Sequence, residues 1–331
     1  MPHLALQGPG LRQQGTGRMT ASEVVMGVIF LSQIVLGVLG NCSLLYRYLF
    51  LHFTGCRLRS TDLILKHLIV ANLVTLLCRG VPETMAAFSW QVCLSHAGCK
   101  LLFYLHRLSR GASMGSTCLL SVSWAITISP RDSRPAELKV KAAKYVGSSL
   151  CLIWVLCGLV NVIFLTHMTG KWSKKNHTSL KDFGYCTSVR QDKTTESLYT
   201  VLLSVPEVSC LGLMLWTSSS MVSVLYRHRQ QMRHIHRTNV TPRSSPESRA
   251  TKTILLLVST YICFYALSCI FQVWLSLTYN PHWLLLNTSA IVAGLFPAVS
   301  PFLLLSRDSS VSRLSVAFIR NRKAPAHVTN G

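Results

Sequence analysis

Several ionisable side chains lie inside long apolar stretches of the sequence, where charged groups are rare. Arg110 follows Arg107 by three residues and His106 by four, which places these side chains on one side of a helix. Glu207 is the one acid well inside an apolar run. An unpaired charge in apolar surroundings is costly, so we expect Glu207 to pair with Arg107 or with Arg110. The sequence leaves open whether this pair only joins two helices or also contacts a ligand.

The sequence gives little support for a hydrolase active site or a metal site. Residues 111–115 match the GxSxG pattern of serine hydrolases. That pattern works on a strained strand-to-helix turn, whereas here it lies inside an apolar helical stretch. The sequence contains no HExxH string, no CxxC pair and no cluster of carboxylates. We therefore expect a protein that is not an enzyme and that holds no metal and no cofactor.

The elements that must hold these side chains are membrane spans. Half of the 331 residues are apolar and 13% are charged, and the apolar residues come in long runs. About 20 helical residues cross a bilayer core of ~30 Å. The sequence predicts an all-α membrane protein, a seven-transmembrane helix bundle in the cell membrane. Its spans are Val24–Tyr46, Leu63–Cys78, Lys100–Ser129, Val146–Leu165, Leu198–Leu225, Thr253–Tyr279 and Trp283–Ser306.

Basic residues between the spans predict the orientation. The net charge of +22 would suit nucleic-acid binding only on a soluble fold with a basic face, and these charges instead lie between apolar runs. With these span bounds, 20 loop and tail Lys and Arg fall on one side and nine on the other. The positive-inside rule then places the N-terminus outside and the C-terminus inside. We expect an outer tail at 1–23, the seven-span domain at 24–306 and a basic cytoplasmic tail at 307–331.

The outer loop between the fourth and fifth predicted spans carries two features that suit an exterior location. Asn176 begins an Asn-His-Thr glycosylation sequon, whereas the sequon at Asn239 falls in an inner loop. Cys186 follows in the same outer loop and can reach Cys99 at the outer mouth of the third span. The exterior permits disulfides. We predict a Cys99–Cys186 bond, with Cys93 as the rival partner for Cys186.

Strings along the chain resemble the vomeronasal type-1 receptors, a family of G-protein-coupled pheromone receptors. They are GVPETMAAF at 80–88, CKLLFYLHR at 99–107, AITISP at 125–130, HIHR at 234–237, FPAVSPF at 296–302 and SRD at 306–308. The resemblance covers nearly the whole chain. It implies a rhodopsin-like bundle, and Asn72 stands where most of that wider class carries a sodium-binding Asp.

The resemblance also implies a function. A small pheromone-like molecule would bind among the outer halves of the spans, with His106, Arg107, Arg110 and Glu207 as candidate contacts. A heterotrimeric G protein of the Gi/Go type would dock inside, and Arg227, Arg229, Arg233 and Arg237 are its candidate contacts. Those four arginines could equally form a solvated face or bind lipid head groups.

Two other functions remain open at this point. One is a receptor that resembles the bitter-taste receptors. The other is a seven-span transporter or channel, although the sequence shows no internal repeat of the kind on which many transporters are built.

Overall fold

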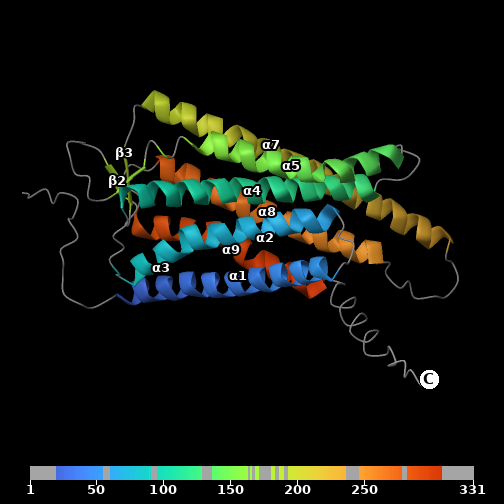
Figure 1. Cartoon of the computed structure of the whole chain (residues 1–331), viewed down its shortest axis with the longest axis horizontal. Helices are drawn as coiled ribbons and strands as arrows, with labels where there is room; N and C mark the ends of the chain where they lie inside the picture. The colour runs from blue at the N-terminus through green and yellow to red at the C-terminus, as the bar shows by residue number, and fades with distance from the viewer. Residues whose placement is uncertain are drawn as a thin grey trace, which may run out of the picture.

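The computed structural model is a bundle of long helices that lie side by side (Figure 1). It describes residues 20–54, 60–88, 90, 95–128, 136–162, 165, 168–170, 180–182, 186–189, 193–235, 246–277 and 282–307. The helices are α1 (Ala21–Phe53), α2 (Ser60–Thr75), the π-helical turn η1 (Leu76–Gly80), α3 (Val81–Ala87), α4 (His96–Ile128), α5 (Ala136–Asn161), α7 (Lys193–Ile235), α8 (Pro246–Leu277) and α9 (Trp283–Arg307).

Within the described ranges, six helical segments are long and apolar enough to cross a membrane. They lie in α1, in the continuous α2–η1–α3 rod, in α4, α5, α8 and α9. The seventh long helix, α7, contains the predicted span 198–225 and extends ten residues beyond it, to Ile235. The helical bundle predicted from the sequence is therefore present.

The second span is longer than the sequence predicts. The predicted span ends at Cys78, whereas the helical rod continues through η1 and α3 to Ala87. A π-helical turn holds an extra residue, which rotates the helix that follows it. Arg79 and Glu83 consequently belong to the membrane rod rather than to a loop.

A small antiparallel sheet lies at one end of the bundle, near the start of α4 (Figure 1). Its strands are β1 (Met168–Gly170), β2 (Leu180–Asp182) and β3 (Cys186–Val189), in the order β1-β3-β2. Met168 pairs with Ser188 and Leu180 with Val189. The sequence did not predict these strands, because none is longer than four residues.

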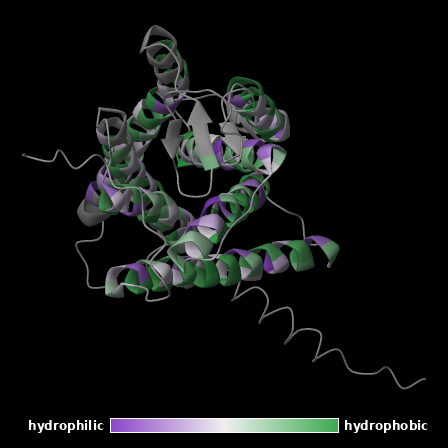
Figure 2. Cartoon of the chain, turned by 90° about the vertical axis from the view of Figure 1, so that its left-hand side faces the viewer, coloured by the Kyte–Doolittle hydropathy of each residue, from purple (hydrophilic) through white to green (hydrophobic). Residues whose placement is uncertain are grey.

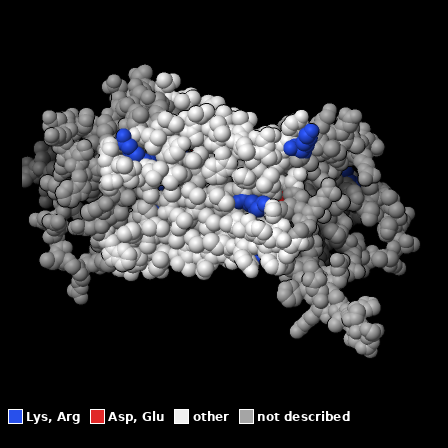
Figure 3. Space-filling view, viewed as in Figure 1, with Lys and Arg blue, Asp and Glu red and all other residues white. Residues whose placement is uncertain are grey.

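The outer surface of the bundle is apolar. The end-on view shows described helices made mostly of hydrophobic residues (Figure 2), and few basic side chains interrupt the uncharged face in Figure 3. Large side chains such as Leu39, Leu159 and Trp216 are more than half exposed. Exposure on this scale is not typical of soluble monomers and suits contact with lipid.

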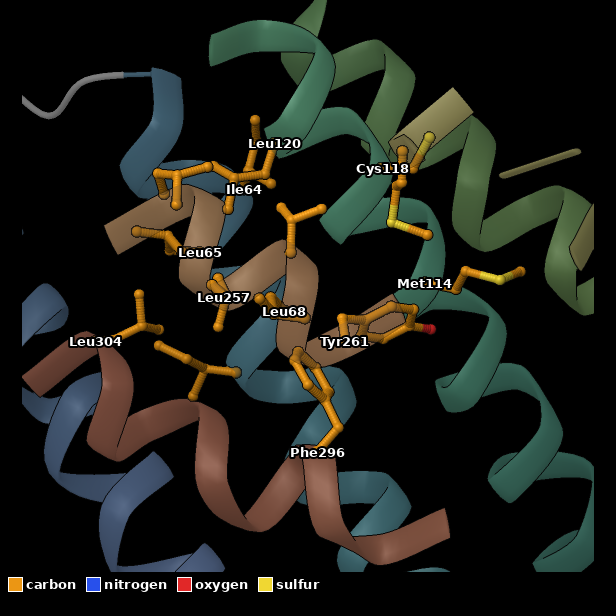
Figure 4. Packing of buried hydrophobic residues seen from close by; sticks show 14 of the residues in the cluster. Ile64, Leu65, Leu68, Met114, Cys118, Leu120, Leu257, Tyr261, Phe296 and Leu304 are labelled. Atoms are coloured by element: carbon orange, nitrogen blue, oxygen red, sulfur yellow. The ribbon is translucent and has the colours of Figure 1, made fainter. Parts of the chain in front are cut away.

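The buried apolar core joins α2, α4, α8 and α9 (Figure 4). Tyr261 of α8 meets Phe296 of α9 edge-on, with ring centroids 4.4 Å apart. Helix α4 packs against α2, α5, α7 and α8, and is therefore the central helix. The labelled core residues are Ile64, Leu65, Leu68, Met114, Cys118, Leu120, Leu257, Tyr261, Phe296 and Leu304.

Some helices approach each other so closely that a glycine at the contact leaves no room for a side chain, and this gives a first prediction. A Cβ atom at Gly37 of α1 would lie 2.6 Å from Leu76 Cδ1 and 3.2 Å from the backbone Cα of Ala298. The backbone of α9 cannot rotate away as a side chain can, so Gly37→Ala should overpack the α1–α9 contact and destabilise the protein by about 1–3 kcal/mol.

The matched control is Gly212→Ala in α7, where a new Cβ meets no atom within 4 Å. Alanine is the better helix former, so this change should leave thermal stability unchanged or slightly raised. The measurement is the melting temperature of purified protein. Equal melting temperatures for the two variants would contradict the tight α1–α9 contact.

Candidate functional site

The buried charges of α4 meet α7 in an ion pair. Arg107 Nη2 lies 3.7 Å from Glu207 Oε1, and both side chains are less than one-fifth exposed. Arg107 Nε also donates to Asn161 Oδ1 of α5 at 3.4 Å. Of the two arginines predicted as partners of Glu207, Arg107 is therefore the one that pairs with it, and its guanidinium connects three helices.

Arg110 has different surroundings. Its Nη1 donates to Ser268 Oγ of α8 at 3.0 Å, and its guanidinium carbon lies 4.7 Å from the ring centroid of Tyr265. The residue is 8% exposed, and its Nε and Nη2 atoms have no hydrogen-bond partner. Arg110 thus attaches α4 to α8 through neutral groups.

His106 lies one turn of α4 before Arg110 and is also buried, at 7% exposure. Its Nδ1 atom has no hydrogen-bond partner, and its carbonyl accepts from the hydroxyl of Ser109. The structure therefore brings His106, Arg107, Arg110 and Glu207 into one half of the bundle.

A second charged pair was missed by the sequence analysis. Arg79 Nε lies 3.9 Å from Glu83 Oε1, and the two residues are four positions apart on the η1–α3 rod. Opposite charges at this spacing are a recognised helix pair and were the available signal. They were overlooked because the predicted span stopped at Cys78.

A cavity of about 30 Å³ lies beside Arg110, between α2, α4, α8 and α9. Arg110 and the hydroxyl residues Thr75, Ser113 and Ser268 provide its polar lining. Aromatic residues of α8 and α9, including Phe264 and Phe296, form much of the remainder. A smaller cavity of about 20 Å³ reaches Arg79 and Glu83 and shares Thr75 with the first.

A buried network of neutral polar groups begins at this cavity. Ser113 donates to Asn72 Oδ1 at 2.9 Å, and Asn72 Nδ2 donates to Ser300 Oγ at 3.0 Å. Asn41 Nδ2 donates to the carbonyl of Pro297 at 2.9 Å. These bonds connect α1, α2, α4 and α9 without any ionised group.

A disulfide joins Cys99 of α4 to Cys186 of β3, the pair that the sequence predicts. Both cysteines are fully buried, with Leu102 and Phe103 packed against them. The bond fixes the sheet to the mouth of α4. The rival Cys93 lies outside the described residues.

The structure describes only some of the remaining candidate residues. Arg227 is exposed near the end of α7, and Arg229 and Arg233 lie on the following turns of the same helix. Arg237 and the sequon residue Asn176 lie outside the described residues.

Comparison with known proteins adds a consistent set of similarities. The model of the vomeronasal organ pheromone receptor family matches residues 24–317. The chain is 55% identical over 302 residues to vomeronasal type-1 receptor 4 of Homo sapiens, covering 91% of this chain and all of the relative. It is 53% identical to vomeronasal type-1 receptor 2 of Homo sapiens (88% of this chain, 74% of the relative). It is 34% identical to vomeronasal type-1 receptor 90 of Rattus norvegicus (86% and 91%).

The geometry predicts that Glu207 couples energetically to Arg107 more strongly than to Arg110. Glu207→Gln and Arg107→Gln should each destabilise the protein, because each leaves a buried charge without its partner. The double variant should recover part of the loss, with an interaction energy of about 0.5–3 kcal/mol. The measurement is a double-mutant cycle on the thermal stability of purified protein. Its matched control is the Glu207→Gln, Arg110→Gln cycle, and a larger coupling there would contradict the assignment.

Proposed function

Because the chain belongs to the vomeronasal organ pheromone receptor family, we propose that it binds a small pheromone-like molecule and activates a Gi/Go-type G protein. Family membership makes it a multi-pass receptor of the cell membrane whose class binds ligands and couples to G proteins. The ligand class, the type of G protein and the orientation are the parts that we propose.

The observation that carries the ligand-binding proposal is the cavity beside Arg110. It lies in the half of the bundle that holds the disulfide, about 16 Å along α4 from Cys99 at 1.5 Å per residue. A site with a few convergent polar groups in an apolar lining is typical of small-molecule recognition. The N-terminus outside, which the basic loops favour, would open this half to external ligands.

The proposed mechanism uses α8 as the moving element. Arg110 and the aromatic lining hold α8 through contacts at Ser268 and Tyr265. A ligand that contacts these groups differently in two arrangements of α8 shifts the population toward the arrangement it binds better. At the opposite end, Arg227, Arg229 and Arg233 of α7, together with Arg237 beyond its described end, would form the docking surface for the G protein.

The functional test is a G-protein activation assay in cells that express the full chain. Ligand-dependent activation should be abolished by pertussis toxin, which blocks Gi/Go proteins. Replacing Arg227, Arg229, Arg233 and Arg237 by Gln should reduce activation at equal surface expression. Matched replacements at Arg320 and Arg322 in the C-terminal tail should have a smaller effect. Ligand-induced flux in liposomes without a G protein would instead favour a transporter or channel.

The proposed orientation predicts which sequon carries glycan. Asn176 should be glycosylated, because its loop faces the lumen during synthesis, and Asn239 should not. Each Asn is replaced by Gln, and gel mobility is compared before and after glycosidase treatment. A mobility change caused by the Asn239 replacement would reverse the orientation.

A further inference from the structure

The charged groups inside the ligand-binding half do not balance. Among the described helices of that half, Arg79, Arg107 and Arg110 are interior cations. Glu83 and Glu207 are the interior acids, and the ion pairs assign them to Arg79 and Arg107 respectively. Arg110 forms no ion pair among the described residues. Among the described residues, the interior therefore carries one positive charge in excess.

Neutral groups compensate this charge only in part. Arg110 keeps one hydrogen bond, to Ser268, and lies over the Tyr265 ring, while its Nε and Nη2 atoms have no partner. A buried charge without a counter-charge is strongly destabilising. A purely structural role would be served better by an apolar residue of similar size, so the unpaired donors indicate a negatively charged partner that comes from outside the chain.

The cavity beside Arg110 has the shape and chemistry for such a partner. Its volume of about 30 Å³ accommodates a group the size of a carboxylate. Ser268 accepts from Arg110 Nη1, so its own hydroxyl hydrogen can be donated to the same group. Tyr261, Phe264 and Phe296 form apolar walls nearby, against which a hydrocarbon body would be favoured.

We propose that the ligand of this receptor carries one negatively charged oxygen group on an apolar body, and that Arg110 binds that group. This inference rests on the proposed function. Arginine N–H groups bind oxyanions through charge-assisted hydrogen bonds, which are about twice as strong as neutral ones. The cavity holds only the head group, so the apolar body must displace aromatic side chains of α8 or α9. A neutral ligand of the same shape leaves Arg110 uncompensated and binds more weakly.

The first test needs no ligand. Purified full-length wild type, Arg110→Gln and Arg107→Gln are compared by thermal unfolding in a chloride-free gluconate buffer. Arg107→Gln should lower the melting temperature, because it leaves Glu207 unpaired. Arg110→Gln removes an uncompensated charge, so its melting temperature should equal or exceed that of the wild type. A loss at Arg110→Gln as large as that at Arg107→Gln would assign Arg110 to the structural network and overturn the proposal.

The second test uses probes that share one hydrocarbon body: octanoate, octanol and octylammonium. Octanoate should raise the melting temperature of the wild type more than either other probe does. Arg110→Gln should abolish this difference, and Arg110→Lys, which keeps the charge, should retain part of it. Equal shifts with all three probes would overturn the proposal.

Adding chloride distinguishes a site for an organic anionic ligand from a site for a small inorganic anion. If chloride raises the melting temperature of the wild type and octanoate adds nothing, the site takes an inorganic anion and the ligand proposal fails. The G-protein assay keeps this inference apart from the proposed function. A neutral activator that is unaffected by Arg110→Gln would overturn the anionic ligand and leave the receptor function intact. Octanoate binding that depends on Arg110, in a protein that activates no G protein, would support the anionic ligand site and overturn the receptor function.

Discussion

Inside a lipid bilayer no water is available to a backbone N–H or C=O group, so each of these must find its partner within the chain. This constraint explains the backbone, which is helical through the described spans. The absence of water also explains why interior hydroxyls bond back to their own helix, as Thr117 does to the carbonyl of Ser113. Polar side chains that cannot be satisfied locally become contacts between helices. Asn41 and Asn72 reach α9 in this way, and Glu207 reaches α4.

Helix α4 concentrates these contacts, because its polar side chains face several neighbours at once. Ser109 bonds to Thr75 of α2 and Arg110 to Ser268 of α8. The GxSxG match in the same helix has a packing explanation. A Cβ atom at Gly111 would lie 2.8 Å from Cys157 Sγ, and one at Gly115 would lie 2.6 Å from Ile153 Cγ2, both in α5. The glycines let the two helices approach closely, as small residues commonly do in membranes.

Local patterns in the sequence predicted the six helical segments that are apolar enough to cross a membrane, because hydropathy depends only on the residues within each run. The end of the second segment was predicted too early, at Cys78. The scarcity of interior acids likewise predicted that Glu207 would pair with an arginine of α4. The choice between Arg107 and Arg110 was not predictable, since these residues differ by only about 60° around the helix. That choice depends on how α4 is rotated against α7 and α8, which a single sequence does not encode locally. The π-helical turn at Leu76–Gly80 was not predictable either, because one extra residue in a helical turn does not change the hydropathy of the segment.

The position of Arg110 connects charge compensation to conformational change. Arg110 holds α8 through Ser268 and Tyr265, and one turn earlier in α8 Tyr261 packs against Phe296 of α9. Ser113 lines the same cavity and bonds to Asn72, which continues the contact to α9. An anion that competes with Ser268 for the guanidinium weakens the attachment of α8 to α4 while the α4–α2–α9 network stays bonded. Such a ligand has different affinities for the attached and released positions of α8, which is the condition for any ligand to shift a conformational equilibrium.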